Sequence, residues 1–262
     1  MCIRDSTNSG SITTTTAGGA IDNATVNNSS GTLSTGGTFT LDDATINGGT
    51  LTGNPGSHGV YVVDGGDTLT LNGVTAMGGT GMGVVENSGI ITLEYGLTIA
   101  GSSFTLELTN AGTVSLNGQT ITGTAGETFE NNGNTIVGAG KIGDGSGNLT
   151  LDNASGTIES TGNGLTLSLD TGATILNAGL LEAGNNSTLL AVDSISGSGQ
   201  LKIGNQATLK LDGSDAGEQI TFLGNSGTGT SAGTLTLNDT SVSGANATID
   251  ATSSTKLSLI HI

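Results

Sequence analysis

The chain has 262 residues, a formal net charge of −17 at pH 7 and only 10% charged residues. Such an acidic chain repels nucleic acid and anionic lipid, so we expect neither as a partner. No window of about 18 apolar residues is present, which excludes a transmembrane helix. Aromatic residues make up 2% of the chain, whereas 33% of residues are apolar and often lie beside Thr, so the composition favours strands over disorder.

The two ends of the chain are related at the DNA level. The hexapeptides MCIRDS (residues 1–6) and LSLIHI (residues 257–262) can be encoded by reverse-complementary strings that match a transposase adapter used in sequencing. We therefore predict that residues 1–6 and 257–262 are translated adapter and not native protein. On this interpretation residues 7–256 are an internal fragment of a longer protein, and they contain no Cys and no Arg.

Short motifs recur along the chain at a nearly constant period. Near the N-terminus, residues 22–27 (DNATVN) recur as residues 42–47 (DDATIN). Further on, a motif of Asn, Ser or Ala, Gly, any residue and an aliphatic residue recurs in strict or looser form. These copies start at Asn87, Asn110, Asn131, Asn153 and Asn177, at nearly even intervals. A short and nearly even period of this kind is typical of a solenoid built from stacked repeats.

Between these motifs, apolar residues alternate with hydroxyl residues. The pattern is clearest at residues 68–71, 149–151, 165–167, 208–211 and 234–237. An alternation with period two places one residue type on each face of a strand. We therefore predict short strands that point Leu inward and Thr outward, joined by corners of Gly and Asn, which tolerate a positive φ.

Together these patterns predict an all-β fold, a right-handed parallel β-helix with about 20–24 residues per coil. Residues 7–256 would form a single repeat domain, uncapped at both ends, with ~11 coils and a length of roughly 50 Å. Equivalent Asn residues of successive coils could form hydrogen-bonded ladders along the rod. The alternative architecture is a string of β-sandwich modules, but these normally bury aromatic residues and have a much longer period.

Several stretches resemble the β-strand-repeat regions of large bacterial surface proteins. These stretches are residues 134–143, 147–151, 156–159, 177–183 and 195–201, and the resemblance covers most of residues 85–250. The family comprises proteins of the hemagglutinin, adhesin and autotransporter-passenger type. The resemblance implies export and a role in adhesion or biofilm formation, but it brings no binding residue with it.

An enzyme is the rival interpretation, because parallel β-helices also serve as polysaccharide-degrading enzymes. Asp42 and Asp43 with Ser57-His58-Gly59 are similar to the acidic residues and Gly-His-Gly turn of polygalacturonases. The native segment lacks Arg, however, and its four Lys residues lie far along the chain. The carboxylate pairs Glu127/Glu130 and Asp212/Asp215 have the residue types of a glycosidase, but an acidic rod produces such pairs by chance. We therefore predict that the chain is not an enzyme.

No cofactor is expected, and calcium is the one metal with a candidate site. Asp144, Ser146, Asn148 and Asp152 offer oxygen ligands at alternate positions, although Leu149 stands where a calcium loop has Gly. Outward Thr-x-Thr pairs, such as those at residues 68–70 and 234–236, could bind ice if they formed regular rows. We expect these rows to lose register, because the coil length varies from one repeat to the next.

The function that we predict is structural: a stalk or passenger segment of a large secreted or cell-surface adhesin, outside the cell or attached to the outer membrane. Its partners would be host or neighbouring cells, glycans or matrix, reached through the parent protein. The alternative is a polysaccharide-active enzyme or a glycan-binding face. Residues 54–66 are the least repeat-like stretch, so the candidate binding surface consists of His58, Tyr61 and Tyr95.

Overall fold

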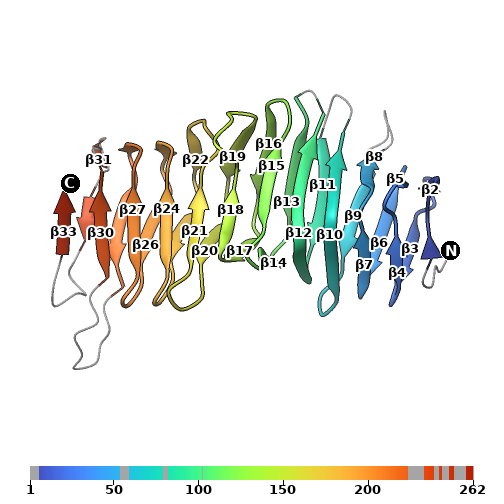
Figure 1. Cartoon of the computed structure of the whole chain (residues 1–262), viewed down its shortest axis with the longest axis horizontal. Helices are drawn as coiled ribbons and strands as arrows, with labels where there is room; N and C mark the ends of the chain where they lie inside the picture. The colour runs from blue at the N-terminus through green and yellow to red at the C-terminus, as the bar shows by residue number, and fades with distance from the viewer. Residues whose placement is uncertain are drawn as a thin grey trace.

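The computed structural model is a rod of parallel strands, with the N-terminus at one end and the C-terminus at the other (Figure 1). It describes residues 6–53, 59–78, 82–101, 103–223, 233–238, 242–243, 248–250 and 258–261. These residues contain strands, turns and bends but no helix. The strands pair in parallel, and strands about 22 residues apart stack into a β-helix of about 10 turns. The predicted fold class is therefore confirmed.

Three ladders of strands run along the rod. Ladder A consists of β1 (Ser6–Thr7), β4 (Thr25–Asn27), β7 (Ala44–Asn47), the first half of β10 (Thr68–Met77) and of β12 (Ile90–Ala100), β14 (Thr113–Ser115), β17 (Thr135–Gly138), β20 (Thr157–Ser160), β23 (Leu180–Ala183), β26 (Gln200–Ile203), β29 (Gln219–Phe222) and β32 (Thr248–Asp250). Ladder B consists of β2 (Ser11–Thr14), β5 (Thr32–Thr35), β8 (Thr50–Gly53), the second half of β10 and of β12, β15 (Thr120–Gly123), β18 (Gly140–Ile142), β21 (Thr166–Leu169), β24 (Thr188–Ala191), β27 (Thr208–Leu211), β30 (Thr234–Leu237) and β33 (Ser258–His261). Ladder C consists of β3 (Gly19–Asp22), β6 (Thr38–Asp42), β9 (Val60–Val63), β11 (Met82–Asn87), β13 (Thr105–Thr109), β16 (Glu127–Asn131), β19 (Leu149–Asn153), β22 (Ile175–Asn177), β25 (Ile195–Gly197), β28 (Asp215–Ala216) and β31 (Val242–Ser243).

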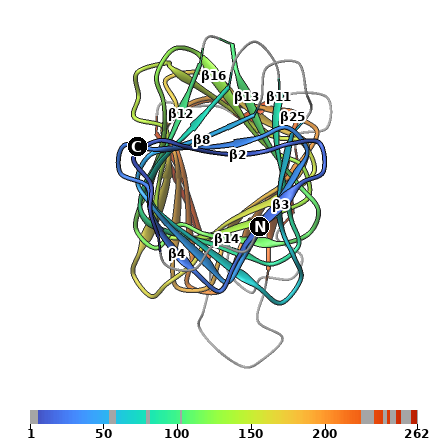
Figure 2. The same cartoon turned by 90° about the vertical axis from the view of Figure 1, so that its right-hand side faces the viewer.

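The chain visits the ladders in the order A, B, C and then begins the next coil. Seen from the N-terminal end in Figure 2, it passes clockwise from β2 through β3 to β4 while moving away from the viewer. This is the sense of a right-handed coil, which parallel crossovers strongly favour. Strands β1 and β33 contain residues of the two predicted adapter segments, and the origin of those segments stays a prediction.

The core is a thin column of aliphatic side chains, as the alternation predicted. In ladder A one inward position is in register through seven coils and is buried in each of them: Ile91, Val114, Ile136, Ile158, Leu181, Leu201 and Ile220. The residues on either side of this position in each strand point outward; they include Thr113, Thr135 and Thr157, which are partly exposed. Each inward side chain thus packs on its equivalents above and below, so the coils stabilise one another along the whole rod.

The Asn motif has a structural reason in the corner between ladders C and A. Asn131, Asn153 and Asn177 are buried, and each of the first two donates its side-chain Nδ2 to the Oδ1 of the next, at 2.9 and 2.7 Å. The motif's Gly makes room for this amide, because a Cβ on Gly156 would lie 2.1 Å from Asn131 Nδ2. The predicted ladders therefore exist, and they explain why Asn and Gly recur together.

One motif copy does not join the buried ladder. Asn110 is exposed and has a φ of 72°, whereas the buried position is taken by Asn134, whose Oδ1 accepts from Asn87 Nδ2 at 2.8 Å. The short spacing from Asn110 to Asn131 places the two outside register, because Asn131 is paired with Leu108. The expectation that each copy of the motif places its Asn in the buried ladder was therefore wrong at this coil.

Candidate functional site

The acidic pair that suggested a polygalacturonase-like site supports neighbouring coils instead. Asp42 Oδ1 accepts a hydrogen bond from Asp64 N at 3.0 Å, and Asp43 Oδ1 accepts one from Thr68 N at 3.1 Å. Asp43 has a φ of 44°, as expected at a tight corner. Partial burial, together with the charges of nearby Asp residues, raises the pKa of Asp42 despite the hydrogen bond from Asp64. His58 lies outside the described residues.

The pair Glu127 and Glu130 points to opposite sides of β16. Glu127 is fully buried and accepts hydrogen bonds from Thr124 N at 2.7 Å and Ala125 N at 2.8 Å. Burial raises the pKa of Glu127, but these backbone hydrogen bonds outweigh it and hold the pKa below its usual value. Glu130 faces outward, where burial and the charges of Glu107 and Asp152 raise its pKa. The two carboxylates therefore cannot flank one glycosidic bond.

The second pair, Asp212 and Asp215, is separated in the same way. Asp212 lies on the surface, where its Oδ1 is 3.2 Å from Lys210 Nζ. Asp215 is fully buried on the inward face of β28. A cleft that carries both carboxylates is therefore not formed.

The candidate calcium loop folds as a tight turn. Asp144 Oδ1 accepts hydrogen bonds from the hydroxyl and the backbone N–H of Ser146, and these lower the pKa of Asp144. Asn148 N donates to Ser146 Oγ at 3.3 Å. Asp152 instead faces outward on β19, in register with Glu130. Within the described segments no group of three or more His, Cys, Asp or Glu residues could hold a metal ion, and calcium binding by Asp144, Ser146, Asn148 and Asp152 stays a prediction.

The two tyrosines of the candidate binding surface have opposite environments. Tyr95 is 67% exposed on β12, in register with Asn72. Tyr61 is buried in β9, where its ring stacks on Phe39 with centroids 5.9 Å apart. Its hydroxyl donates to Leu33 O at 2.7 Å, and burial raises its pKa. The prediction that Tyr61 contributes to a surface was therefore wrong: the ring is a wide filler of the core.

The Tyr61 hydroxyl should contribute to stability. Thr52 N also donates to Tyr61 Oη, at 3.1 Å. A Tyr61→Phe substitution would therefore leave Thr52 N without its acceptor and Leu33 O without its donor. We expect this substitution to lower the free energy of unfolding by about 1–2 kcal/mol, as measured by urea denaturation. Tyr95→Phe is the matched control and should leave stability unchanged, and an equal loss in both variants would contradict the role assigned to Tyr61.

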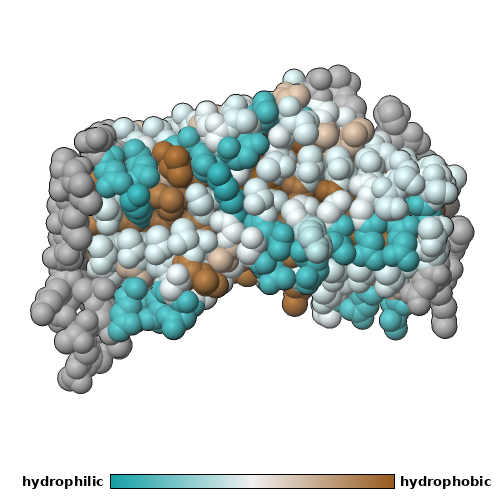
Figure 3. Space-filling model, in the orientation of Figure 1, coloured by the Kyte–Doolittle hydropathy of each residue, from teal (hydrophilic) through white to brown (hydrophobic). Residues whose placement is uncertain are grey.

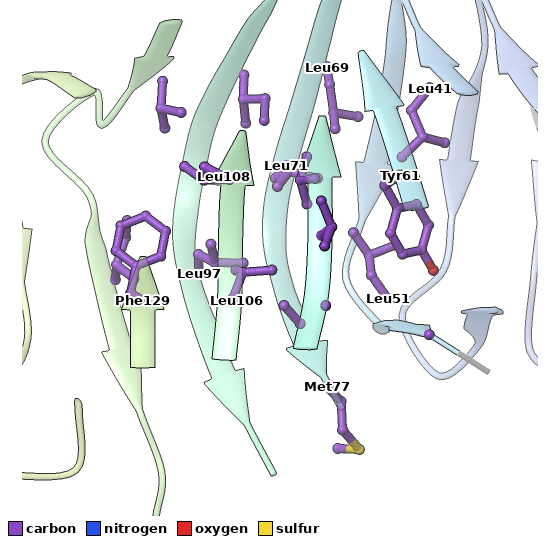
Figure 4. A pocket seen from close by; sticks show the side chains of 18 of the residues that line it. Leu41, Leu51, Tyr61, Leu69, Leu71, Met77, Leu97, Leu106, Leu108 and Phe129 are labelled. Carbon is purple, nitrogen blue, oxygen red and sulfur yellow. The ribbon is translucent and has the colours of Figure 1, made fainter. Parts of the chain in front are cut away.

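An apolar cavity of about 50 Å³ lies in the core beside β9, β10 and β12. Its lining includes Leu41, Leu69, Leu106 and Phe129, which point into it from different coils (Figure 4). The cavity lies where β10 and β12 run on from ladder A into ladder B. An apolar cavity of this size stays dry and offers no convergent polar groups for chemistry.

Hydroxyl side chains form rows that stay in register along the rod. On ladder B, the row consists of Ser11, Thr32, Thr50, Thr75, Thr98 and Thr122. On ladder A, Thr70 is paired with Thr45 before it and with Thr92 after it, although the two spacings in the sequence differ. The expectation that variable coil length shifts the register was wrong, because the connections between strands absorb the extra residues. The rows at the two Thr-x-Thr pairs are nevertheless interrupted by other residue types, since Thr68 is paired with Ile90 and Thr236 with Lys210. Figure 3 shows one face of the molecule, where mostly pale residues of intermediate hydropathy lie among hydrophilic patches and hydrophobic residues form small separate groups.

Comparison with known proteins gave no relative. No family model, no curated protein and no solved structure matches the chain. Among the described residues, no helix is long and apolar enough to span a membrane. The fold alone does not define a function, since a solenoid can carry many unrelated sites.

Proposed function

We propose that this chain is a structural rod, a stalk or passenger segment of a large secreted or cell-surface adhesin. The observation that carries the proposal is the unbroken stacking of one aliphatic column through seven coils of ladder A. Each coil contacts its neighbours along three ladders, so bending or stretching the rod would separate packed side chains. A spacer needs this stiffness, whereas it does not need a reactive centre.

The positions of the acidic residues also support a structural role. Asp42, Asp43 and Glu127 accept hydrogen bonds from backbone N–H groups, and in each suspected carboxylate pair one acid is buried while the other faces outward. Acids used in this way orient corners and keep the surface hydrated. Adhesion to cells, glycans or matrix would then reside in other parts of the parent protein, and we propose an extracellular or outer-membrane-associated location.

The experiment compares the chain with a flexible linker of about 80 residues, whose r.m.s. end-to-end distance of roughly 50 Å equals the length expected for the rod. The rod and the linker each carry the same binding module at one end. The other end is attached to a bead coated with a polymer brush, and the height of the brush is increased from one bead preparation to the next. The rod holds its module at one height, whereas the matched linker spends much of its time coiled closer to the bead, so brushes slightly lower than the rod should reduce capture by the linker much more than capture by the rod. Equal capture by rod and linker at every brush height would contradict the proposal, as would polysaccharide hydrolysis by the chain alone.

A glycan-binding face is the second candidate function, favoured by the ladder B row from Ser11 to Thr122. Its hydroxyls repeat once per coil and could donate and accept hydrogen bonds along an extended polysaccharide. Binding of the chain to insoluble polysaccharides, lost in a Thr75→Val and Thr98→Val variant, would establish it. Thr221→Val with Thr236→Val is the control, because these two outward Thr residues have register partners without a hydroxyl group and so belong to no hydroxyl row. No binding by the unmodified chain would exclude this candidate.

A further inference from the structure

A carboxyl group interrupts the apolar column of ladder C. The column runs through Leu151, Ile175 and Ile195, and the next residue in register is Asp215, which is itself paired with Val242. Asp215 has an exposed fraction of 0%, and neither of its carboxyl oxygens accepts a well-formed hydrogen bond, although the backbone N–H of Glu218 lies nearby. A buried polar group without a partner is strongly unfavourable when it is charged.

A second buried carboxyl lies next to it. Glu218, also 0% exposed, follows β28 directly, and its Oε2 accepts a hydrogen bond from Asn177 Nδ2 at 2.7 Å, whereas its Oε1 has no partner. The residues in register after Asn177 are Gly197 and then, one coil later, Gly217, neither of which carries a side chain. Glu218 thus ends the amide ladder of Asn131, Asn153 and Asn177 with a carboxyl.

No positive charge faces this pair among the described residues. The strands packed around it, β22, β25, β29 and β31, carry no titratable side chain. Asp193 precedes β25, but it accepts from the backbone N–H groups of Thr171 and Gly172. Lys202 and Lys210 occupy outward positions of β26 and β27, and Lys210 is paired with Asp212. Among the described residues, Asp215 and Glu218 therefore have each other, Asn177 and the backbone N–H of Glu218 as polar neighbours, and no cation.

Both groups hold protons more tightly than they would in water. Burial raises the pKa of Asp215 from 3.8 to about 6, although the backbone N–H of Glu218 opposes this. Burial also raises the pKa of Glu218 from 4.5 to about 7, against the hydrogen bond from Asn177 and assisted by the charge of Asp215. In the protonated pair each carboxyl can donate a hydrogen bond, whereas the ionised pair places two negative charges in a dry column.

We propose that Asp215 and Glu218 form a pH-sensitive latch, which holds the coil beginning at β28 onto the preceding coils when it is protonated and loosens that coil when it is ionised. The folded state binds these protons more tightly than the unfolded state. The free energy of unfolding therefore falls as pH rises from the pKa values of the two groups in the unfolded chain to their pKa values in the folded chain. The latch contributes fully below about pH 4, where both groups are protonated even in the unfolded chain. Its contribution is lost as pH rises through about 6 and about 7.

Hydrogen exchange of the full chain tests the latch. Protection factors, corrected for intrinsic exchange, are compared at pH 5 and pH 8 for peptides of residues 215–222 and, as an internal reference, of residues 127–153. We expect protection in the first segment to fall at least tenfold at pH 8 while the reference changes little. Equal protection at both pH values would overturn the proposal.

Substitutions separate the latch from general charge effects. Asp215→Leu keeps the branched shape but removes the charge, so it should raise protection at pH 8 and leave only the part of the pH dependence that Glu218 contributes; Asp215→Asn serves if the leucine variant does not fold. Glu218→Gln should reduce the pH dependence. Glu94→Gln, at an exposed carboxyl, removes the same charge and should leave the dependence unchanged. Restoration of protection at pH 8 by calcium or magnesium ions would overturn the latch in favour of a cation site.

Discussion

Replacing Ile158 with alanine should lower the free energy of unfolding by about 3–4 kcal/mol, the largest effect that we expect from a single substitution. Ile158 is fully buried between Ile136 and Leu181 in the ladder A column. The strands on both sides are held in place by their own ladder hydrogen bonds, so the coils cannot collapse into the space that the side chain leaves. The midpoint of urea unfolding, followed by circular dichroism, measures the loss.

The neighbouring residue Glu159 provides the control for Ile158. It belongs to the same strand but faces outward, in register with Glu182. Glu159→Ala should change the free energy of unfolding by less than about 1 kcal/mol, because it opens no space in the core. If the two substitutions had similar effects, the inward column would not be the source of stability.

Asn153→Ala should be the second most damaging substitution, with a loss of about 2–4 kcal/mol. Asn153 accepts from Asn131 and donates to Asn177 Oδ1 and Leu180 O, all within the buried corner. Its removal leaves two buried acceptors without their donor, and it interrupts a chain of amides that polarise one another. Thermal unfolding of the full chain, monitored by circular dichroism, would report the loss.

Asn110→Gly is the matched control for the ladder, because Asn110 begins a copy of the same motif but is exposed. Its φ of 72° suits glycine, so we expect a change within about 0.5 kcal/mol. A loss at Asn110 as large as that at Asn153 would show that the motif acts through its corner conformation and not through the buried hydrogen bonds.

The architecture could be predicted because period and alternation act at every coil. A strand that alternates Leu with Thr can bury only one face, and a nearly constant repeat length places these faces above one another. The row through Thr45, Thr70 and Thr92 shows what the period alone misses. The register is fixed by hydrogen bonding between paired strands. Variation in the number of residues per coil therefore changes the connections between strands and leaves the rows of Thr residues in register.

The environments of single polar residues were harder to predict. Tyr61 looked like a surface aromatic because its surroundings in the sequence are irregular, yet its alternation with Val60 and Val62 places it inward. In the sequence Asp215 belongs to a pair of acids expected by chance, and Glu218 stands in no recurring motif. Their one sequence signal is position, since Asp215 lies one coil after Ile195, where the repeat expects an aliphatic residue. The period predicts which strand positions face the core. It does not predict whether a side chain in the connection after a strand, such as that of Glu218, points into the core or into solvent.

The central claim is that successive coils stack in a fixed register, and paired cysteines test it most directly. Thr135 and Thr157 are register partners that face outward on β17 and β20. With Cys2 replaced by serine, Thr135→Cys with Thr157→Cys should form a disulfide under mild oxidation, because paired parallel strands lie about 4.8 Å apart. Thr135→Cys with Glu159→Cys is shifted by two residues, which separates the Cα atoms by roughly 8 Å and prevents the bond. Cross-linking of the first pair alone is the predicted result, whereas equal cross-linking of both pairs, or of neither, would contradict the stacked solenoid.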